Sequence, residues 1–189
     1  INETTEEAFN LLENLLRWTR NQNGKTKIYA TLFNLTPVAR QVVSLFSAIA
    51  NAKEIELINR IEGKFDIFAD EDMIKTVLRN LISNAIKFTY TGGQVELSLA
   101  DSGDYWTIYV KDNGKGIPKD LQTHLLKSDE YITTYGTHNE KGSGLGLILC
   151  RDFIRMNKGK LHFCSQEGIG TTFYFTIPKA SSSAKAASR

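Results

Sequence analysis

Two asparagines and a lysine on one predicted helix, residues 70–88, have side chains that can hold a metal ion and phosphate groups. The stretch Asn80-Leu-Ile-Ser-Asn-Ala-Ile-Lys-Phe-Thr89 places Asn80, Asn84 and Lys87 at one border of an apolar stripe. Polar groups beside a core need partners. An amide oxygen can ligate Mg²⁺, and an ammonium can bind phosphate. Taken alone, the three residues also fit helix-border residues bonded to a neighbouring loop.

A carboxylate ends the predicted strand of residues 105–112. By the two-residue period of a strand, Asp112 continues the core-facing row of Trp106, Ile108 and Val110. We therefore expect Asp112 at the mouth of the space between sheet and helices. A carboxylate there needs hydrogen-bond donors, and the exocyclic amine of adenine is one. Taken alone, Asp-Asn-Gly also fits a common turn or a β-bulge.

Two glycine clusters follow the carboxylate. Gly114 and Gly116 lack β-carbons, so a flat base could approach the backbone there, with Ile117 as an apolar wall. The second cluster, Gly142-Ser-Gly-Leu-Gly146, leads into a predicted helix of residues 145–157. A helix start offers free N–H groups and a positive dipole to a phosphate. The spacing fits neither a P-loop nor a dinucleotide fingerprint, and a flexible loop that caps a helix is the alternative.

The elements that must position these residues alternate between helical and strand patterns. A mobile loop is expected at 128–143. The predicted helices are 5–22, 36–52, 70–88, 118–127 and 145–157, and the predicted strands are 28–35, 54–61, 65–69, 94–100, 105–112, 160–165 and 171–177. This intermixing predicts a two-layer α/β sandwich with a mixed, mostly antiparallel sheet.

Composition excludes some classes of protein. The 189 residues carry a formal charge of +2, which argues against binding to nucleic acid or to an anionic membrane. No apolar run reaches the roughly 18 residues of a membrane span, so we expect no membrane contact. The two cysteines, Cys150 and Cys164, have no CxxC spacing and are predicted to be free, buried thiols.

The order of the motifs resembles that of the N box and the two glycine boxes of the GHKL ATP-binding superfamily. The resemblance rests on Asn84, then Asp112-x-Gly-x-Gly116, then Gly142-x-Gly-x-Gly146, and Gly168-x-Gly-Thr-Thr-Phe173 looks like the family's closing strand. The chain is most similar to catalytic, ATP-binding domains of sensor histidine kinases, of the Bacteroidetes type and possible hybrids. The resemblance implies the GHKL (Bergerat) fold, with helices on one face of the sheet and nucleotide between the layers under a mobile lid.

The resemblance also implies roles for individual residues and two ligands, ATP and Mg²⁺. It implies that Asn84 binds Mg²⁺, that Lys87 contacts phosphate and that Asp112 recognises the adenine amine. Thr171 shares the inward face of its strand, so its hydroxyl could support Asp112 through a water. The implied nucleotide-binding set is Asn80, Asn84, Lys87, Phe88, Asp112, Gly114, Gly116, Ile117, Lys141, Gly142, Gly144, Leu145, Gly146 and Thr171.

The N-terminal residues resemble the second helix of a histidine-kinase dimerisation domain. We therefore expect three parts: residues 1–24 from the dimerisation domain, an ATP-binding catalytic domain at 28–179, and a linker or disordered tail at 180–189. No H-[DE]-L-R-x-P segment is present, so the phosphoacceptor histidine is expected outside this sequence. The implied partners are the dimerisation domain of the same protein, which makes a homodimer, and a response-regulator receiver. The implied location is the cytoplasmic part of a membrane-anchored sensor.

The residue type at position 80 distinguishes a kinase from a hydrolase, and here it is an asparagine. In the ATP-hydrolysing members of the superfamily, a glutamate that activates water stands one helical turn before the metal-binding asparagine. An amide cannot accept that proton at neutral pH, so transfer to a histidine is favoured over hydrolysis. A GHKL ATPase, a protein serine kinase and a nucleotide-binding module without activity are the alternatives. The motif before the lid also departs from the family, with Leu125-Leu126 where an aromatic residue is usual.

Overall fold

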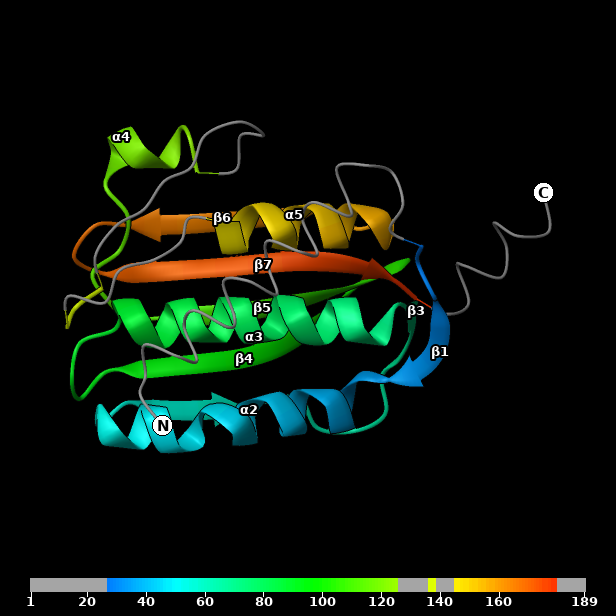
Figure 1. Ribbon diagram of the computed structural model, residues 1–189, viewed down its shortest axis with the longest axis horizontal. Helices are drawn as coiled ribbons and strands as arrows, with labels where there is room; N and C mark the ends of the chain where they lie inside the picture. The colour runs from blue at the N-terminus through cyan, green and yellow to red at the C-terminus, as the bar shows by residue number, and fades with distance from the viewer. Residues whose placement is uncertain (1–26, 126–135, 139–144, 180–189) are drawn as a thin grey trace.

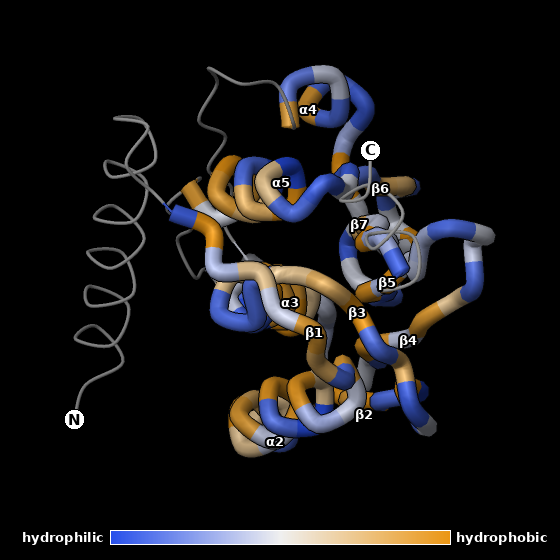
Figure 2. Tube along the Cα trace, turned by 90° about the vertical axis from the view of Figure 1, so that its right-hand side faces the viewer, coloured by the Kyte–Doolittle hydropathy of each residue, from blue (hydrophilic) through white to orange (hydrophobic). Residues whose placement is uncertain are grey.

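A layer of helices covers one face of a five-stranded sheet in the computed structural model, which describes residues 27–125, 136–138 and 145–179 (Figures 1 and 2). The strands lie in the order β2 (Glu56–Asn59), β4 (Gln94–Ser102), β5 (Tyr105–Asp112), β7 (Gly170–Pro178) and β6 (Leu161–Gln166). Only the β2–β4 pair is parallel among these described strands. The predicted two-layer α/β fold with a mixed, mostly antiparallel sheet is confirmed.

Three helices make the second layer, with α3 (Glu71–Phe88) between α2 (Leu35–Ala52) and α5 (Leu145–Met156) (Figure 1). The short α4 (Lys119–Gln122) lies apart from them, and it ends earlier than the predicted helix at 118–127. None of the helices within the described ranges has the length and apolar character needed to cross a bilayer.

Two short strands form a separate small sheet that the sequence patterns do not reveal. β1 (Thr31–Asn34) pairs antiparallel with β3 (Asp66–Ala69), and one bridge from Ile67 to Lys179 joins this pair to the end of β7. The predicted strands at 28–35 and 65–69 are therefore present but shorter. Their pairing depends on a contact between segments more than thirty residues apart, which periodicity cannot report.

Helix α2 begins one residue earlier than its predicted start at Thr36-Pro37. Asn34 is the N-cap, because its side-chain oxygen accepts hydrogen bonds from Thr36 N at 3.2 Å and from Phe65 N at 3.0 Å. Pro37 then lies within the first turn, where a backbone N–H would have no helical acceptor. The same asparagine therefore ends β1, starts α2 and holds the chain just before β3.

Helix α3 begins where the sequence predicts, with Asp70 as its N-cap. One carboxylate oxygen of Asp70 accepts from Met73 N at 3.1 Å, and the other accepts from Tyr29 N at 2.9 Å. The backbone N–H of Asp70 donates to Asn157 Oδ1 at 2.7 Å. The start of α3 is thus fixed by the segment before β1 and by the end of α5.

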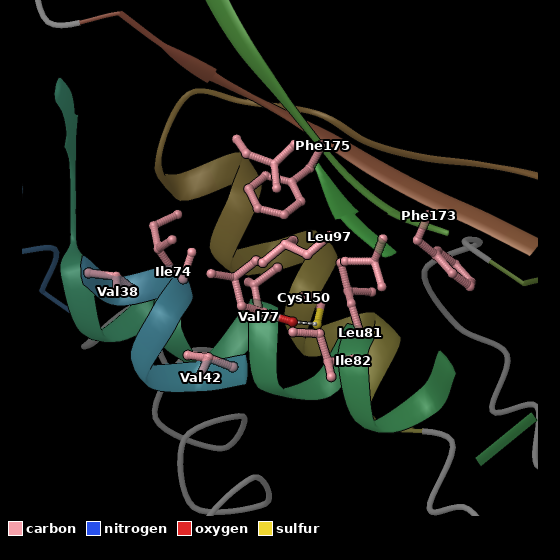
Figure 3. Close-up of a cluster of buried hydrophobic side chains, with 14 of the residues drawn as sticks. Val38, Val42, Ile74, Val77, Leu81, Ile82, Leu97, Cys150, Phe173 and Phe175 are labelled. Carbon is pink, nitrogen blue, oxygen red and sulfur yellow. Dashed lines mark hydrogen bonds between the residues drawn. The ribbon is translucent and has the colours of Figure 1, made fainter. Parts of the chain in front are cut away.

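The core lies between the helices and the sheet and is centred on the apolar stripe of α3 (Figure 3). Val77, Leu81 and Ile82 are buried there, and each fully buried aliphatic side chain contributes roughly 1.5–3 kcal/mol. Cys150 of α5 lies in this core with its Sγ 3.9 Å from Val77 O, and burial raises the pKa of its thiol. The second cysteine, Cys164, is exposed, so the prediction of two buried thiols is wrong for this residue. It lies on the face of β6 opposite to the core-facing residues.

Some predictions fall on residues that the structure does not describe. These are the helix at 5–22, the assignment of 1–24 to a dimerisation domain, most of the loop at 128–143, and the tail at 180–189. Three residues of the expected nucleotide site, Lys141, Gly142 and Gly144, also lie outside the described residues. These assignments, and the extent of the catalytic domain at 28–179, stay predictions.

Candidate functional site

The row of polar residues on α3 lies where the helical period places it. Asn80, Asn84 and Lys87 are half-buried at the border of the core-facing stripe, while Ser83 points to solvent. The Asn80 amide is engaged, because its Nδ2 donates to Thr76 O at 2.9 Å. The Asn84 side chain, by contrast, makes no hydrogen bond within the part of the chain that the structure describes. Asn84 is therefore the asparagine whose amide is available to a ligand.

The start of α5 lies directly against this row. A β-carbon added at Gly146 would be 2.7 Å from Asn80 Oδ1, closer than such contacts occur in proteins. Leu145, the first residue of α5, is half-buried beside it. The described end of the second glycine cluster and the N-box helix are thus in contact, and the N–H groups of the first turn of α5 lie near Asn80.

Asp112 ends β5 as a buried carboxylate with one oxygen committed. The residue is only 7% exposed, and Oδ1 accepts from Gly114 N at 2.9 Å and from Thr171 N at 3.2 Å. Oδ2 accepts no hydrogen bond from the residues described. Burial raises the pKa of Asp112 from 3.8 to about 6, and the two N–H donors oppose this rise. Two donors therefore stabilise the charged form through Oδ1, while Oδ2 has no donor among the described residues.

Thr171 supports Asp112 more directly than the sequence suggests. Its contact with the carboxylate is through its backbone N–H, whereas its hydroxyl lies 2.8 Å from Ser165 Oγ. Ser165 also accepts from Ile117 N at 2.9 Å, so it joins the expected apolar wall of the base site to the strand beside Asp112. Sequence reasoning missed Ser165, because a single serine in a strand carries no motif.

The first glycine cluster is tightly packed against other backbone segments. A β-carbon at Gly114 would collide with the Phe88 carbonyl, and one at Gly116 would collide with the Gln166 carbonyl. Gly116 also has a φ of 69°, which favours glycine. The expectation that these glycines make room for a base is therefore incomplete. Their missing side chains let the loop pack between the end of α3 and the β6–β7 turn.

Comparison with known proteins establishes the family. Residues 69–181 match the family described as histidine kinase-, DNA gyrase B-, and HSP90-like ATPase. The chain belongs to this family. It is 30% identical over 170 residues to the adaptive-response sensory kinase SasA of Crocosphaera subtropica, covering 89% of this chain and 44% of that protein. It is also 30% identical over 182 residues to the circadian input-output histidine kinase CikA of Synechococcus elongatus, covering 95% of this chain and 24% of that protein.

Solved structures agree with this assignment. The catalytic domain of the histidine kinase ThkA has a TM-score of 0.68 at 31% identity, over 80% of this chain and 96% of that one. Full-length ShkA in complex with AMPPNP has a TM-score of 0.78 at 26% identity, over 94% of this chain and 37% of that one. The chain is therefore a histidine-kinase-type, ATP-binding catalytic domain. The chain spans less than half the length of SasA and of CikA.

A second lysine of this ATPase-family domain lies beside the expected base and phosphate site. The ammonium of Lys115 is 5.1 Å from the centroid of the Phe88 ring, and that of Lys87 is 5.4 Å from the same centroid. Two like charges beside one ring favour an anion nearby. Sequence reasoning passed over Lys115, because the motif specifies no residue type between its two glycines, and only the contact of Lys115 with Phe88 reveals it.

The described residues 136–138, within the region expected to be a lid, dock on the end of α3 in this domain. Thr137 N donates to Lys87 O at 3.1 Å, and the Thr137 hydroxyl lies 2.9 Å from Thr89 O. His138 Nε2 lies 3.4 Å from Thr91 Oγ1. This short segment is therefore attached to the helix that carries Asn84 and Lys87.

Proposed function

We propose that this chain is the ATP-binding catalytic part of a two-component sensor histidine kinase. In this proposal it positions ATP so that the γ-phosphoryl group passes to a histidine outside this sequence, and from there to an aspartate of a response regulator. The observation that carries the proposal is the buried carboxylate of Asp112, with Oδ2 uncommitted, beside the helix that carries the available Asn84 and the ammonium of Lys87.

Each part of ATP has a matching group in this arrangement. Asp112 Oδ2 would accept from the exocyclic amine of adenine, and Ile117 and Phe88 would border the base. The ammonium of Lys87 and the start of α5 would contact the phosphates. Lys115, which lies over the same Phe88 ring, adds positive charge to this region.

The residues also fit a magnesium ion brought by the triphosphate. Mg²⁺ prefers oxygen ligands and usually keeps waters and phosphate oxygens with only one or two protein ligands. Asn84 offers one amide oxygen, half-buried and without a hydrogen bond to the described residues. When bound, the ion would neutralise charge that develops on the transferred phosphoryl group. Asn84 would hold the ion on α3, and Lys87 would orient the adjacent phosphates.

The amide of Asn80 favours transfer to a protein histidine over hydrolysis. Its Nδ2 donates to Thr76 O, and its Oδ1 lies against Gly146, so the side chain is engaged in packing. An amide in this place cannot take a proton from water. We propose that the dimerisation domain of the same protein supplies the acceptor and makes the homodimer, and that the catalytic part works in the cytoplasm below a membrane-anchored sensor.

A transfer assay tests the proposal. The 189-residue chain is mixed with the separately produced dimerisation domain of the full-length protein and with Mg·ATP labelled at the γ-phosphate. We expect acid-labile phosphohistidine on the dimerisation domain to form faster than free phosphate appears. Hydrolysis by the chain alone that outpaces transfer would favour a GHKL ATPase. Binding of Mg·ATP without transfer or hydrolysis would favour a nucleotide-binding module without activity. Calorimetry that shows no heat with Mg·ATP would favour a non-catalytic scaffold whose pocket is dead.

The raised pKa of Asp112 predicts two opposite pH dependences. Between pH 3.8 and about 6 the folded protein holds a proton that the unfolded chain has released. The free energy of unfolding therefore falls as pH rises through this window, by at most about 3 kcal/mol. The affinity for adenosine should rise over the same window, because the amine needs the ionised carboxylate. Adenosine is used in place of ATP because it has no phosphate groups, whose own titration would change the affinity in this pH range.

Asp112→Asn is the reference for both measurements, by urea unfolding and by calorimetry from pH 4 to 7. The difference in unfolding free energy between wild type and variant should change with pH, and the variant's adenosine affinity should not. A difference that stays constant across this range would show that Asp112 titrates normally.

A further inference from the structure

A buried lysine at the end of α2 binds carbonyls at the C-terminal end of α3, the helix that carries Asn84 and Lys87. Lys53 is the C-cap residue of α2 and is only 7% exposed. Its Nζ donates to Ile86 O and to Lys87 O, each at 3.0 Å. These carbonyls belong to the last turn of α3, where the helix dipole is negative. Ile86 O also accepts a longer hydrogen bond, of 3.4 Å, from Thr89 N. A buried ammonium needs such partners, and it satisfies them in turn.

The same turn of α3 holds two other parts of the site. Lys87 O also accepts from Thr137 N at 3.1 Å, which attaches residues 136–138. The next carbonyl, Phe88 O, accepts from Lys115 N at 3.0 Å, which attaches the first glycine cluster. Three segments that are distant in sequence therefore meet on three consecutive carbonyls.

We propose that Lys53 is a positioning residue for the nucleotide site. By fixing the Ile86 and Lys87 carbonyls, its ammonium sets the direction of the Lys87 and Phe88 side chains. The Lys53 ammonium also sets the position of the carbonyls to which residues 136–138 and the first glycine cluster attach. Lys53 reaches α3 through backbone carbonyls, so it acts without touching the nucleotide. The inference rests on the proposed ATP site and adds a residue that no motif contains.

A purely structural lysine would predict something different. If Lys53 only adds stability, its loss would lower the free energy of unfolding and leave ligand affinity unchanged in the folded population. If it positions the site, its loss would loosen the last turn of α3 more than the first turn. Binding of the triphosphate would then weaken more than binding of adenosine, because Lys87 lies in that last turn.

Lys53→Met tests this, because methionine keeps the apolar stem and removes all three donors. Lys53→Arg is the rescue variant, and Lys53→Gln, which keeps an N–H donor without the charge, takes its place if the methionine variant does not fold. Lys75→Met is the matched control, since Lys75 lies near the other end of α3 and pairs with Glu71 at 2.8 Å. All are made in the 189-residue chain and measured where circular dichroism shows the fold intact.

Two quantities are measured for each variant. The first is the dissociation constant for Mg·ATP and for adenosine, by calorimetry. The second is the hydrogen-exchange rate of the Lys115 and Thr137 amides, which donate to the last turn of α3, relative to the Ile74 amide in its first turn. For Lys53→Met we expect about tenfold weaker Mg·ATP binding, a smaller change for adenosine, and about tenfold faster relative exchange. Lys53→Arg should recover most of both, and Lys75→Met should change neither.

Unchanged Mg·ATP affinity and unchanged relative exchange in folded Lys53→Met, or in Lys53→Gln if it replaces the methionine variant, would overturn the inference. So would equal losses for Mg·ATP and adenosine without faster relative exchange. If the wild-type chain itself bound no Mg·ATP, the proposed function would fail instead. The exchange ratios would then still decide whether Lys53 holds the last turn of α3.

Discussion

Replacing Asp112 by asparagine is expected to weaken ATP binding about 100-fold and to remove most of the preference for ATP over GTP. Asparagine has nearly the same shape, and its Oδ1 can still accept from Gly114 N and Thr171 N. Its Nδ2 then replaces the Oδ2 acceptor, so a donor faces the donor amine of adenine. Guanine presents a carbonyl at that position, which the new N–H can meet.

Competition binding of ATP and GTP to wild type and variant measures this effect. Asp120→Asn is the control, because Asp120 is an exposed carboxylate on the nearby α4. We expect it to leave both affinities unchanged. If Asp112→Asn kept the wild-type ratio of ATP to GTP affinity, the base would be recognised elsewhere and the proposed site would be wrong.

Replacing Asn84 by alanine is expected to abolish the part of ATP affinity that depends on magnesium. The Asn84 amide makes no hydrogen bond to the described residues, so its removal leaves no buried partner unsatisfied. We therefore expect the free energy of unfolding to change by less than about 1 kcal/mol. The loss should appear in binding alone. Adding Mg²⁺ should raise the ATP affinity of the wild type and should not raise that of the variant.

Calorimetric titration of ATP with excess Mg²⁺ and with a chelator measures this increment directly. Ser83→Ala is the matched control, since Ser83 precedes Asn84 on α3 but is exposed to solvent. A magnesium-dependent increment in Asn84→Ala equal to that of wild type would remove Asn84 as the ligand. It would leave the assignment of Asp112 to the base untouched, because the two measurements are independent.

The sequence predicts best those features that one element controls. The boundaries of α3 follow from Asp70 at its start and a long apolar stripe, and the stripe also places Asn80, Asn84 and Lys87 on one border. The burial of Asp112 follows from the alternation at the end of β5, where Val110 and Asp112 are buried and Lys111 between them is exposed. In these cases local periodicity and tertiary packing agree, so one segment contains enough information.

Features made by two distant segments were not predictable. Lys53 contacts carbonyls 33 and 34 residues further along the chain, and Ser165 contacts Ile117 across 48 residues. The close approach of Gly114 to Phe88 is of the same kind. A motif gives residue types and their spacing. It does not say which carbonyls a buried ammonium will bind, or which backbone segment will pack against a glycine, because the tertiary fold decides both.

The two oxygens of Asp70 have a mechanical consequence. One oxygen holds Met73 N in the first turn of α3, and the other holds Tyr29 N in the entering chain. The chain that enters β1 and the helix that carries Asn84 thus share one carboxylate as an anchor. A displacement of Tyr29 would therefore act on the start of α3 through Asp70.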